Sequence, residues 1–226
     1  MHIDIITLFP DMFTEIFAQS ILHRAQTKGL FSVEVHNLRD YSTNKNRRVD
    51  DYPYGGGAGM VIQIEPVDNC IKHLSSIRKY DEIIYTAPDG QPLTQSLCNE
   101  LSLKENICIL CGHYKGIDER IREHLITREI SIGDYVLSGG ELAAAVIADS
   151  VVRLLPGVLN DETSALTDSF QQELVSPPVY TRPADYNGWK VPEILLNGND
   201  KLIDAWRFEQ AVERTRQRRP GLMDEK

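Results

Sequence analysis

The sequence predicts an α/β protein with a mainly parallel sheet, and two observations support this fold class. First, short apolar runs rich in β-branched residues recur along the first two-thirds of the chain, such as IDIITLF at 3–9 and NICILC at 106–111. Second, segments with helical periodicity separate these runs and end at glycine or proline, as at Gly29. Strands that alternate with helices in this way form βαβ units, whose strands lie parallel.

The expected elements follow one another with short connections. In chain order they are a strand at 3–9, a helix at 10–28, a strand at 31–37, a helix at 66–78, a strand at 82–87, a helix at 94–101, a strand at 106–111, a helix at 116–125, a strand at 128–133, a helix at 138–155 and a last helix at 199–219. Pro88-Asp89-Gly90 is expected to end the third strand, because these residues favour turns. Ser138 and Glu141 have the spacing of a capping box, in which both side chains bond free backbone amides at a helix start.

A polar segment at 160–176, NDETSALTDSFQQELVS, separates two parts of the chain. It has neither a strand signal nor an apolar stripe, so it is predicted to be a linker. We therefore expect one domain at 1–159 and a small helical domain at 177–226.

The charge of the chain is distributed unevenly. The net charge of −9 disfavours a nucleic-acid partner, because proteins that bind phosphates usually carry a basic surface. The window 201–219 nevertheless holds six basic and three acidic residues, and a second basic stretch runs from Arg39 to Arg48. Each patch can dock a phosphate backbone, although a solvated surface is the commoner explanation of a single patch.

Signals for a membrane or for export are missing from the sequence. No apolar run reaches the roughly 20 residues that a membrane-spanning helix needs. The first residues, MHIDIITLFP, lack the basic start and the small-residue cleavage site of a secretory signal. The expected location is the cytoplasm, with no membrane partner.

The four cysteines are few for a disulfide scaffold, and two of them raise the question of zinc or redox chemistry. Two residues separate Cys108 from Cys111, and His113 follows. In a strand, a separation of three places the two thiols on opposite faces of the sheet. We therefore expect buried cysteines in the core and no metal site.

Two glycine-rich stretches are candidates for nucleotide binding. The stretch 54–59, YGGGAG, lacks the Gly-Lys-Ser/Thr ending of a phosphate-binding loop and the spacing of a dinucleotide motif. The stretch 138–141, SGGE, offers only two glycines. Because glycine also lets two backbones approach closely, a tight crossing explains these stretches as well as a ligand contact does.

Three stretches lie at the carboxyl ends of expected strands, at 85–89, 111–116 and 132–140. Open α/β sheets bind ligands at the carboxyl ends of their strands, so these stretches are the expected site. Hydrolysis has little support, because no Ser-His-Asp order and no metal-ligand spacing stands out. A nucleotide-binding oxidoreductase is an alternative, but the chain lacks its glycine fingerprint.

Four motifs closely resemble those of the bacterial tRNA (guanine-N1)-methyltransferases. They read VDDYPYGGGAGM at 49–60, CGHYKGIDER at 111–120, SIGDYVLSGGE at 131–141 and RRP at 218–220. The resemblance extends over essentially the whole chain. It implies S-adenosylmethionine as methyl donor and, as acceptor, guanine 37, the base 3′ of the anticodon in the tRNA anticodon stem-loop. It also implies a SPOUT-class domain with a trefoil knot, and a homodimer with active sites at the subunit interface.

The resemblance places the cofactor in the loops after the expected strands. The implied contacts are Tyr85, Gly112, Ile132, Gly133, Asp134, Tyr135, Val136, Leu137, Gly139 and Gly140. Backbone groups of 132–137 suit the edge of an adenine, and the side chains of Ile132 and Leu137 suit its faces. The alternative is that Ile132, Val136 and Leu137 simply belong to the core.

The resemblance also implies two catalytic residues, Asp168 and Arg153. Guanine N1 carries a proton, so a base must remove it as the methyl group arrives. That base is expected to be Asp168, while Arg153 would stabilise negative charge on guanine O6. From the residues alone, Asp168 is one of several linker acids, and Arg153 suits the carboxyl end of a helix dipole.

Basic residues near the end of the chain are expected to hold the RNA backbone without reading its sequence. They are Arg214, Arg216, Arg218 and Arg219. The chain departs from the family at Lys115, where many relatives carry a glutamate that is tied to guanine recognition or to Mg²⁺ dependence. Lys115 reverses the charge at that point. A non-catalytic RNA-binding dimer of the same fold is the second alternative.

Overall fold

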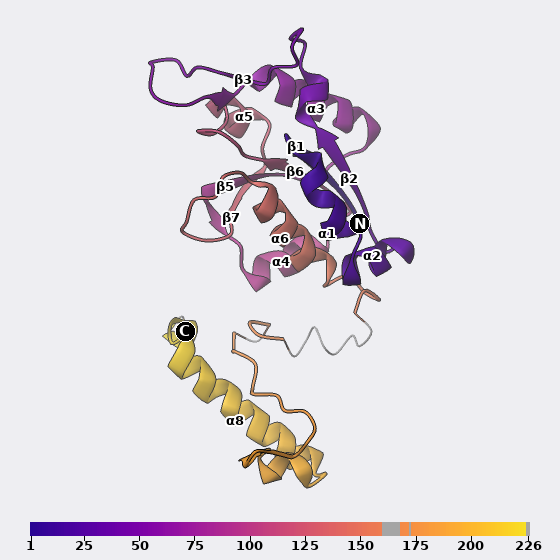
Figure 1. The fold of residues 1–226 in the computed structure, drawn as a ribbon, viewed down its shortest axis with the longest axis vertical. Coiled ribbons are helices and arrows are strands. Elements are labelled where there is room, and N and C mark those ends of the chain that lie inside the picture. The colour runs from indigo at the N-terminus through magenta and orange to yellow at the C-terminus, as the bar shows by residue number, and fades with distance from the viewer. Residues whose placement is uncertain (160–167, 172, 225–226) are drawn as a thin grey trace. The chain divides into compact units, whose positions relative to one another are not determined.

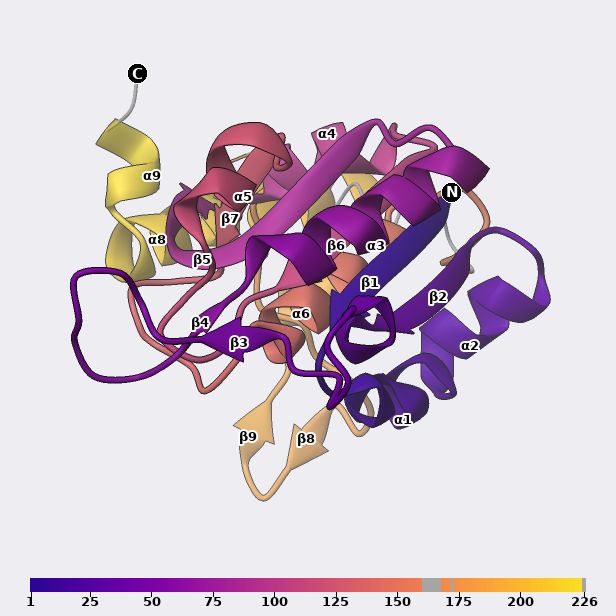
Figure 2. The same ribbon diagram turned by 90° about the horizontal axis from the view of Figure 1, so that it is seen from above.

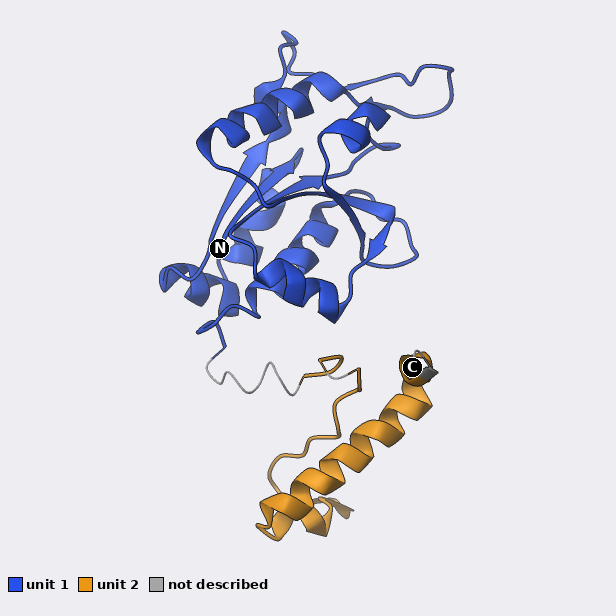
Figure 3. Cartoon of the chain, turned by 180° about the vertical axis from the view of Figure 1, so that it is seen from behind, with its two compact units in different colours: residues 1–160 blue, residues 161–226 orange. Residues whose placement is uncertain are grey.

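The computed structural model describes residues 1–159, 168–171 and 173–224. The chain divides into two compact units, 1–160 and 161–226 (Figure 3). The linker predicted at 160–176 falls partly on residues 160–167 and 172, which lie outside the described residues.

A five-stranded sheet forms the centre of the first unit. Its strands are all parallel and lie in the order β2–β1–β6–β5–β7. They are β1 (His2–Thr7), β2 (Ser32–Asn37), β5 (Glu82–Pro92), β6 (Asn106–Cys111) and β7 (Arg128–Ser131). The predicted α/β class with a parallel sheet is confirmed. A separate antiparallel pair consists of β3 (Asp50–Asp51) and β4 (Val61–Ile62).

Helices cover both faces of the sheet (Figures 1 and 2). One face carries η1 (Pro10–Phe13), α1 (Thr14–Phe17), α2 (Ser20–Thr27), α4 (Gln95–Ser102) and α6 (Glu141–Val152). The other carries η2 (Leu38–Tyr41), α3 (Ile64–Ile77) and α5 (Glu119–His124). Cys108 and Cys111 are buried free thiols in two different core clusters, as predicted for residues on opposite faces of a strand. No helix in the described residues is both long and apolar enough to cross a bilayer.

Several predicted elements differ from the structure. The helix predicted at 10–28 is broken at Ala18 and Gln19, which separate α1 from α2. β5 does not end at Pro88-Asp89-Gly90 but continues to Pro92, because the chain pairs again with β7 after an irregularity. α3 begins at Ile64, so Pro66 lies in its first turn, where proline loses no helical hydrogen bond.

The capping box predicted for Ser138 and Glu141 is wrong. α6 begins at Glu141, its N-cap residue is Gly140, and no side chain caps it. The carboxylate of Glu141 points elsewhere, since its Oε1 accepts a hydrogen bond of 2.8 Å from the Thr7 hydroxyl at the end of β1. α6 ends at Val152, three residues before the predicted Leu155.

The second unit contains a long helix, α8 (Asp200–Arg218), which agrees with the prediction within one residue at each end. The side chain of Asn199 caps it by accepting a hydrogen bond from the Leu202 amide. η3 (Glu193–Leu196) precedes it and α9 (Gly221–Asp224) follows. A hairpin of β8 (Asp185–Tyr186) and β9 (Trp189–Lys190) is not among the predicted elements, although its Asn187-Gly188 turn is a strong hairpin signal.

Candidate functional site

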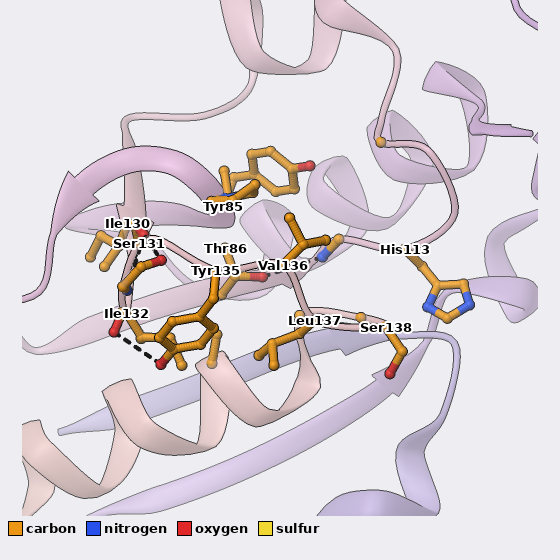
Figure 4. Close-up of a pocket in the computed structure, with 18 of the residues that line it drawn as sticks. Tyr85, Thr86, His113, Ile130, Ser131, Ile132, Tyr135, Val136, Leu137 and Ser138 are labelled. Atoms are coloured by element: carbon orange, nitrogen blue, oxygen red, sulfur yellow. Dashed lines mark hydrogen bonds between the residues drawn. The ribbon is translucent and has the colours of Figure 1, made fainter. Parts of the chain in front are cut away.

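A pocket opens where three parallel strands end. Residues of β5 and of the loops that follow β6 and β7 line it, together with the start of α6 (Figure 4). Its cavity volume is about 150 Å³, and the pocket is open to solvent. Its position is the one at which open α/β sheets bind their ligands.

Gly140 allows two loops to cross at the floor of this pocket. Its amide donates a hydrogen bond of 2.7 Å to the Gly112 carbonyl. A Cβ on Gly140 would lie 2.0 Å from Thr86 Oγ1 and 2.6 Å from the Gly112 amide nitrogen, which leaves no room for a side chain. The tight-crossing interpretation therefore applies to this glycine. It does not apply to Gly55, Gly56 and Gly57, whose Cβ positions face open space.

Two polar side chains meet beside Gly139. A Cβ there would lie 2.3 Å from Glu141 Oε2 and 2.8 Å from His113 Nδ1. Glu141 is only 4% exposed. The pKa of the Cys111 thiol is raised well above its ordinary value, first by the burial of Cys111 and then by the negative charge of Glu141. The buried Nδ1 of His113 has no hydrogen-bond partner among the described residues. The pocket wall thus offers a polar atom for a ligand.

The loop from Ser131 to Leu137 forms one wall of the pocket (Figure 4). The Tyr135 hydroxyl donates to the Ile132 carbonyl at 3.2 Å, and the Tyr135 amide donates to the Gly133 carbonyl at 2.9 Å. These bonds curl the loop back on itself. Val136 is 85% exposed and Leu137 is exposed as well, so the interpretation of these two residues as core is wrong. Ile132 is half-buried and packs against the core.

Tyr85 forms the opposite wall and is held from behind. Its side chain is buried, and burial raises its pKa to about 12. The guanidinium carbon of Arg122 lies 5.7 Å from the centre of the Tyr85 ring, within range of a cation–π interaction. Arg122 in turn donates to Asp89 at 2.8 Å and to Glu129 at 2.9 Å. These bonds raise the pKa of Arg122, so the cation behind Tyr85 is permanent.

The structure brings together nine of the ten residues that the motifs predict for the cofactor. The pocket is lined by Tyr85, Gly112, Ile132, Gly133, Tyr135, Val136, Leu137, Gly139 and Gly140. Asp134 is the exception, because it is not among the lining residues. Thr86 and His113 also line the pocket but are not among the predicted contacts. The only signal for them in the sequence is their position near the carboxyl ends of expected strands.

The comparisons with known proteins decide the family. A family model described as tRNA (Guanine-1)-methyltransferase TrmD matches residues 1–225. The chain belongs to this family. It is 62% identical over 224 residues to the tRNA (guanine-N(1)-)-methyltransferase of Flavobacterium psychrophilum, covering 99% of this chain and 100% of the relative. It is 61% and 60% identical over 225 residues to the enzymes of the same name from Flavobacterium johnsoniae and Bacteroides thetaiotaomicron, in each case covering 100% of both chains. The resemblance read from the four motifs is therefore confirmed.

The pocket of this TrmD-family chain combines apolar side chains with backbone polar groups. Backbone amides and carbonyls of 132–137 lie in its wall, and Leu137 and Ile132 provide apolar surface. The lack of room for a Cβ at Gly140 reflects the close approach of the loops at the pocket floor. Flat aromatic ligands bind in pockets of this kind, with apolar walls and a few fixed polar atoms.

The two residues implied as catalytic lie in different units of the chain. Arg153 is the C-cap residue of α6 in the first unit, and its amide donates to the Asp149 carbonyl at 3.1 Å. Asp168 belongs to the second unit and is partly buried. Its carbonyl accepts a hydrogen bond of 3.4 Å from the Gln171 amide. Neither residue is among those that line the pocket.

The four arginines expected to bind RNA have different surroundings at the end of α8. Arg216 is paired with Glu213 at 2.6 Å, and the guanidinium of Arg219 lies 5.3 Å from the Phe170 ring centre. The Nε of Arg214 is buried and has no partner among the described residues. Arg218 is exposed and makes no ion pair within the described part of the chain. It is therefore the most available cation of the four.

One group of side chains outside the pocket has the composition of a metal site. His2, Asp4 and Glu34 present ligand atoms within 4.8 Å of one another at the edge of the sheet. Asp4 is already satisfied, because Arg78 donates to it at 3.0 Å and Tyr80 also donates to it. Ion pairs within the protein explain this group, and no other such cluster occurs among the described residues.

Proposed function

We propose that the chain is an S-adenosylmethionine-dependent methyltransferase that methylates N1 of guanine 37 in tRNA. The observation that carries the proposal is the convergence of nine motif residues in one pocket of a TrmD-family chain. Curated relatives about 60% identical over their full length are named tRNA (guanine-N(1)-)-methyltransferase. Function in the cytoplasm, where tRNA is modified, accords with this activity.

The pocket residues would bind and orient the donor. Ile132 and Leu137 would enclose an adenine, and the backbone of 132–137 would bond its edge. When bound, S-adenosylmethionine supplies an electrophilic methyl group on a sulfonium. Gly139 and Gly140 let the loops close without an intervening side chain. The close approach of these loops supports a SPOUT-type knot in residues 1–159, which remains part of the proposal.

Asp168 and Arg153 would act on the guanine. The Asp168 carboxylate would take the N1 proton as the methyl group passes from the donor sulfur to N1. Arg153 stabilises the negative charge that grows on O6. The family resemblance implies that this carboxylate comes from one subunit and serves the pocket of the other. We therefore propose a homodimer with active sites at the subunit interface.

The small domain at 177–226 would hold the anticodon stem-loop. Arg214, Arg216, Arg218 and Arg219 lie on or directly after α8, where they suit contacts to phosphates. Such contacts position the RNA, while an unpaired loop base is available for enclosure in a pocket.

The test is mass spectrometry of undermodified tRNA after incubation with the purified protein and isotopically labelled S-adenosylmethionine. We expect one labelled methyl group on guanine 37, at N1. Label on another base, or at another guanine position, would contradict the proposed acceptor. A protein that binds tRNA but transfers no label would support the non-catalytic alternative. A titration with Mg²⁺ and with a chelator in the same assay measures the metal dependence that the family resemblance implies.

A further inference from the structure

Lys115 is the only side chain with a permanent charge among the residues that line the pocket. The other lining residues are apolar, are glycines, or carry hydroxyl groups, apart from His113. A single cation at the edge of a mainly neutral pocket marks the place where an anionic part of a ligand would bind.

The backbone around Lys115 is fixed by hydrogen bonds to β4 and to the residue before it. The Lys115 amide donates to the Met60 carbonyl at 2.9 Å, and the Ile62 amide donates to the Gly116 carbonyl at 3.0 Å. A Cβ on Gly59 would lie 3.5 Å from the Lys115 Cβ, so the stem of the lysine runs beside this glycine. The side chain itself is exposed. The backbone of Lys115 is therefore fixed, whereas its side chain can adjust to a ligand.

Nearby acidic side chains do not neutralise Lys115. Lys115 makes no ion pair within the described part of the chain. Asp118 is engaged by Arg120, which donates to it at 2.6 Å, and Asp50 accepts a hydrogen bond of 3.2 Å from the Tyr114 hydroxyl. The ammonium group thus keeps three donors for an acceptor supplied from outside.

We propose that Lys115 binds the α-carboxylate of the methionyl part of the cofactor. The inference rests on the proposed function, because it takes the pocket to be the S-adenosylmethionine site. The adenosine part of the cofactor suits the apolar wall at Ile132 and Leu137. Its amino-acid end carries an ammonium and a carboxylate group, which are costly to bury against an apolar surface. That end therefore belongs at the mouth, where Lys115 provides the opposite charge. A charge-assisted hydrogen bond there sets the position of the methionyl chain.

The test uses two ligands that differ only beyond the thioether. S-adenosylhomocysteine carries the amino-acid end, whereas 5′-methylthioadenosine lacks it. Their dissociation constants are measured by calorimetry for the full-length protein and for Lys115→Met, Lys115→Arg and Lys79→Met. Lys79 is exposed, lies before the start of β5 and is not among the residues that line the pocket, so it is the matched control.

We expect Lys115→Met to weaken S-adenosylhomocysteine about tenfold, as for loss of one hydrogen bond to a charged group, and to leave 5′-methylthioadenosine unchanged. Lys115→Arg should restore most of the affinity, and Lys79→Met should change neither ligand. Unchanged 5′-methylthioadenosine binding also shows that the variant is folded.

The possible failures are distinguishable. If Lys115→Met weakens both ligands equally or neither, the carboxylate assignment is overturned. A loss of tRNA affinity without any change in S-adenosylhomocysteine binding would instead assign Lys115 to an RNA phosphate. If the unaltered protein binds neither ligand, the cofactor assignment under the proposed function fails, and this inference fails with it.

Discussion

Gly140 and Thr86 approach so closely that a methyl group on the glycine would lie 2.0 Å from the threonine hydroxyl. The contact joins the loop before α6 to the middle of β5. The Gly140 amide also donates a hydrogen bond of 2.7 Å to the carbonyl of Gly112, in the loop after β6. One residue without a side chain thus sets the distance between three pocket segments.

Gly140→Ala is expected to destabilise the protein and to abolish S-adenosylhomocysteine binding. Overpacking of this kind costs about 1–3 kcal/mol, and the pocket loops must separate to accept the methyl group. Thermal unfolding and calorimetry measure the two effects. Gly221→Ala is the control, because a Cβ at Gly221 faces open space. Normal ligand affinity in Gly140→Ala would show that the crossing does not shape the pocket.

Asp168→Asn is expected to slow methyl transfer at least about 100-fold, the usual contribution of a general base, with unchanged cofactor binding. The amide keeps the shape of the side chain but cannot accept the N1 proton. Single-turnover methylation of tRNA measures the rate. Glu173→Gln alters another acid of the same segment and should leave the rate unchanged. A full rate in Asp168→Asn would remove the residue from the mechanism.

Mixed dimers of Gly140→Ala and Asp168→Asn are expected to regain partial methylation activity. If the pocket and the base come from different subunits, one of the two sites in each mixed dimer has both parts intact. Co-expression with two affinity tags isolates these dimers for assay. Mixed dimers as inactive as both parents would place the pocket and the base in the same subunit.

The sequence predicts the parallel sheet well, because strands such as β6 are continuous apolar runs between clear helices. It predicts the irregular features less well. Pro88-Asp89-Gly90 favours a turn locally, yet the chain extends to Pro92 because pairing with β7 resumes. Glu141 has the spacing of a capping residue, yet its carboxylate accepts a hydrogen bond from the hydroxyl of Thr7, which lies 134 positions away along the chain. Both outcomes depend on contacts between distant segments, which local patterns do not contain.

The sequence also predicts some residues of the candidate site and misses others. The strand–loop pattern correctly places Tyr85, Gly112 and the loop from Ile132 at one edge of the sheet. Asp134 follows Gly133 in the motif, but its side chain does not line the pocket, because the loop curls back through the Tyr135 hydrogen bonds. The support of Tyr85 by Arg122 joins residues from β5 and α5, so no local motif predicts it.

Arg218→Ala is expected to weaken tRNA binding and to lower the slope of log affinity against log salt by about 0.7–0.9, the effect of losing one phosphate contact. Arg216→Ala should have a smaller effect, because Glu213 already pairs with Arg216 at 2.6 Å. Filter binding at several salt concentrations measures both slopes. Arg24→Ala changes a basic residue on α2 and serves as the control. An unchanged slope in Arg218→Ala would exclude this phosphate contact.

Asp4 links stability to pH at the edge of the sheet away from the pocket. Burial by itself would raise its pKa, but hydrogen bonds from His36, Tyr80 and His2 outweigh it and lower the pKa from 3.8 to about 2. A depressed folded-state pKa stabilises the protein above the unfolded-state value, and this stability is lost as the pH falls from 3.8 toward 2.

Asp4→Asn is therefore expected to cost about 2 kcal/mol of unfolding free energy at neutral pH, and progressively less below the ordinary carboxyl pKa. Urea unfolding at a series of pH values measures the gap between the variant and the unaltered protein. Asp11→Asn changes an exposed carboxylate and should show no such trend. A gap that stays constant down to the acid limit would mean that Asp4 contributes through shape and hydrogen bonding, and that its charge has no part in the effect.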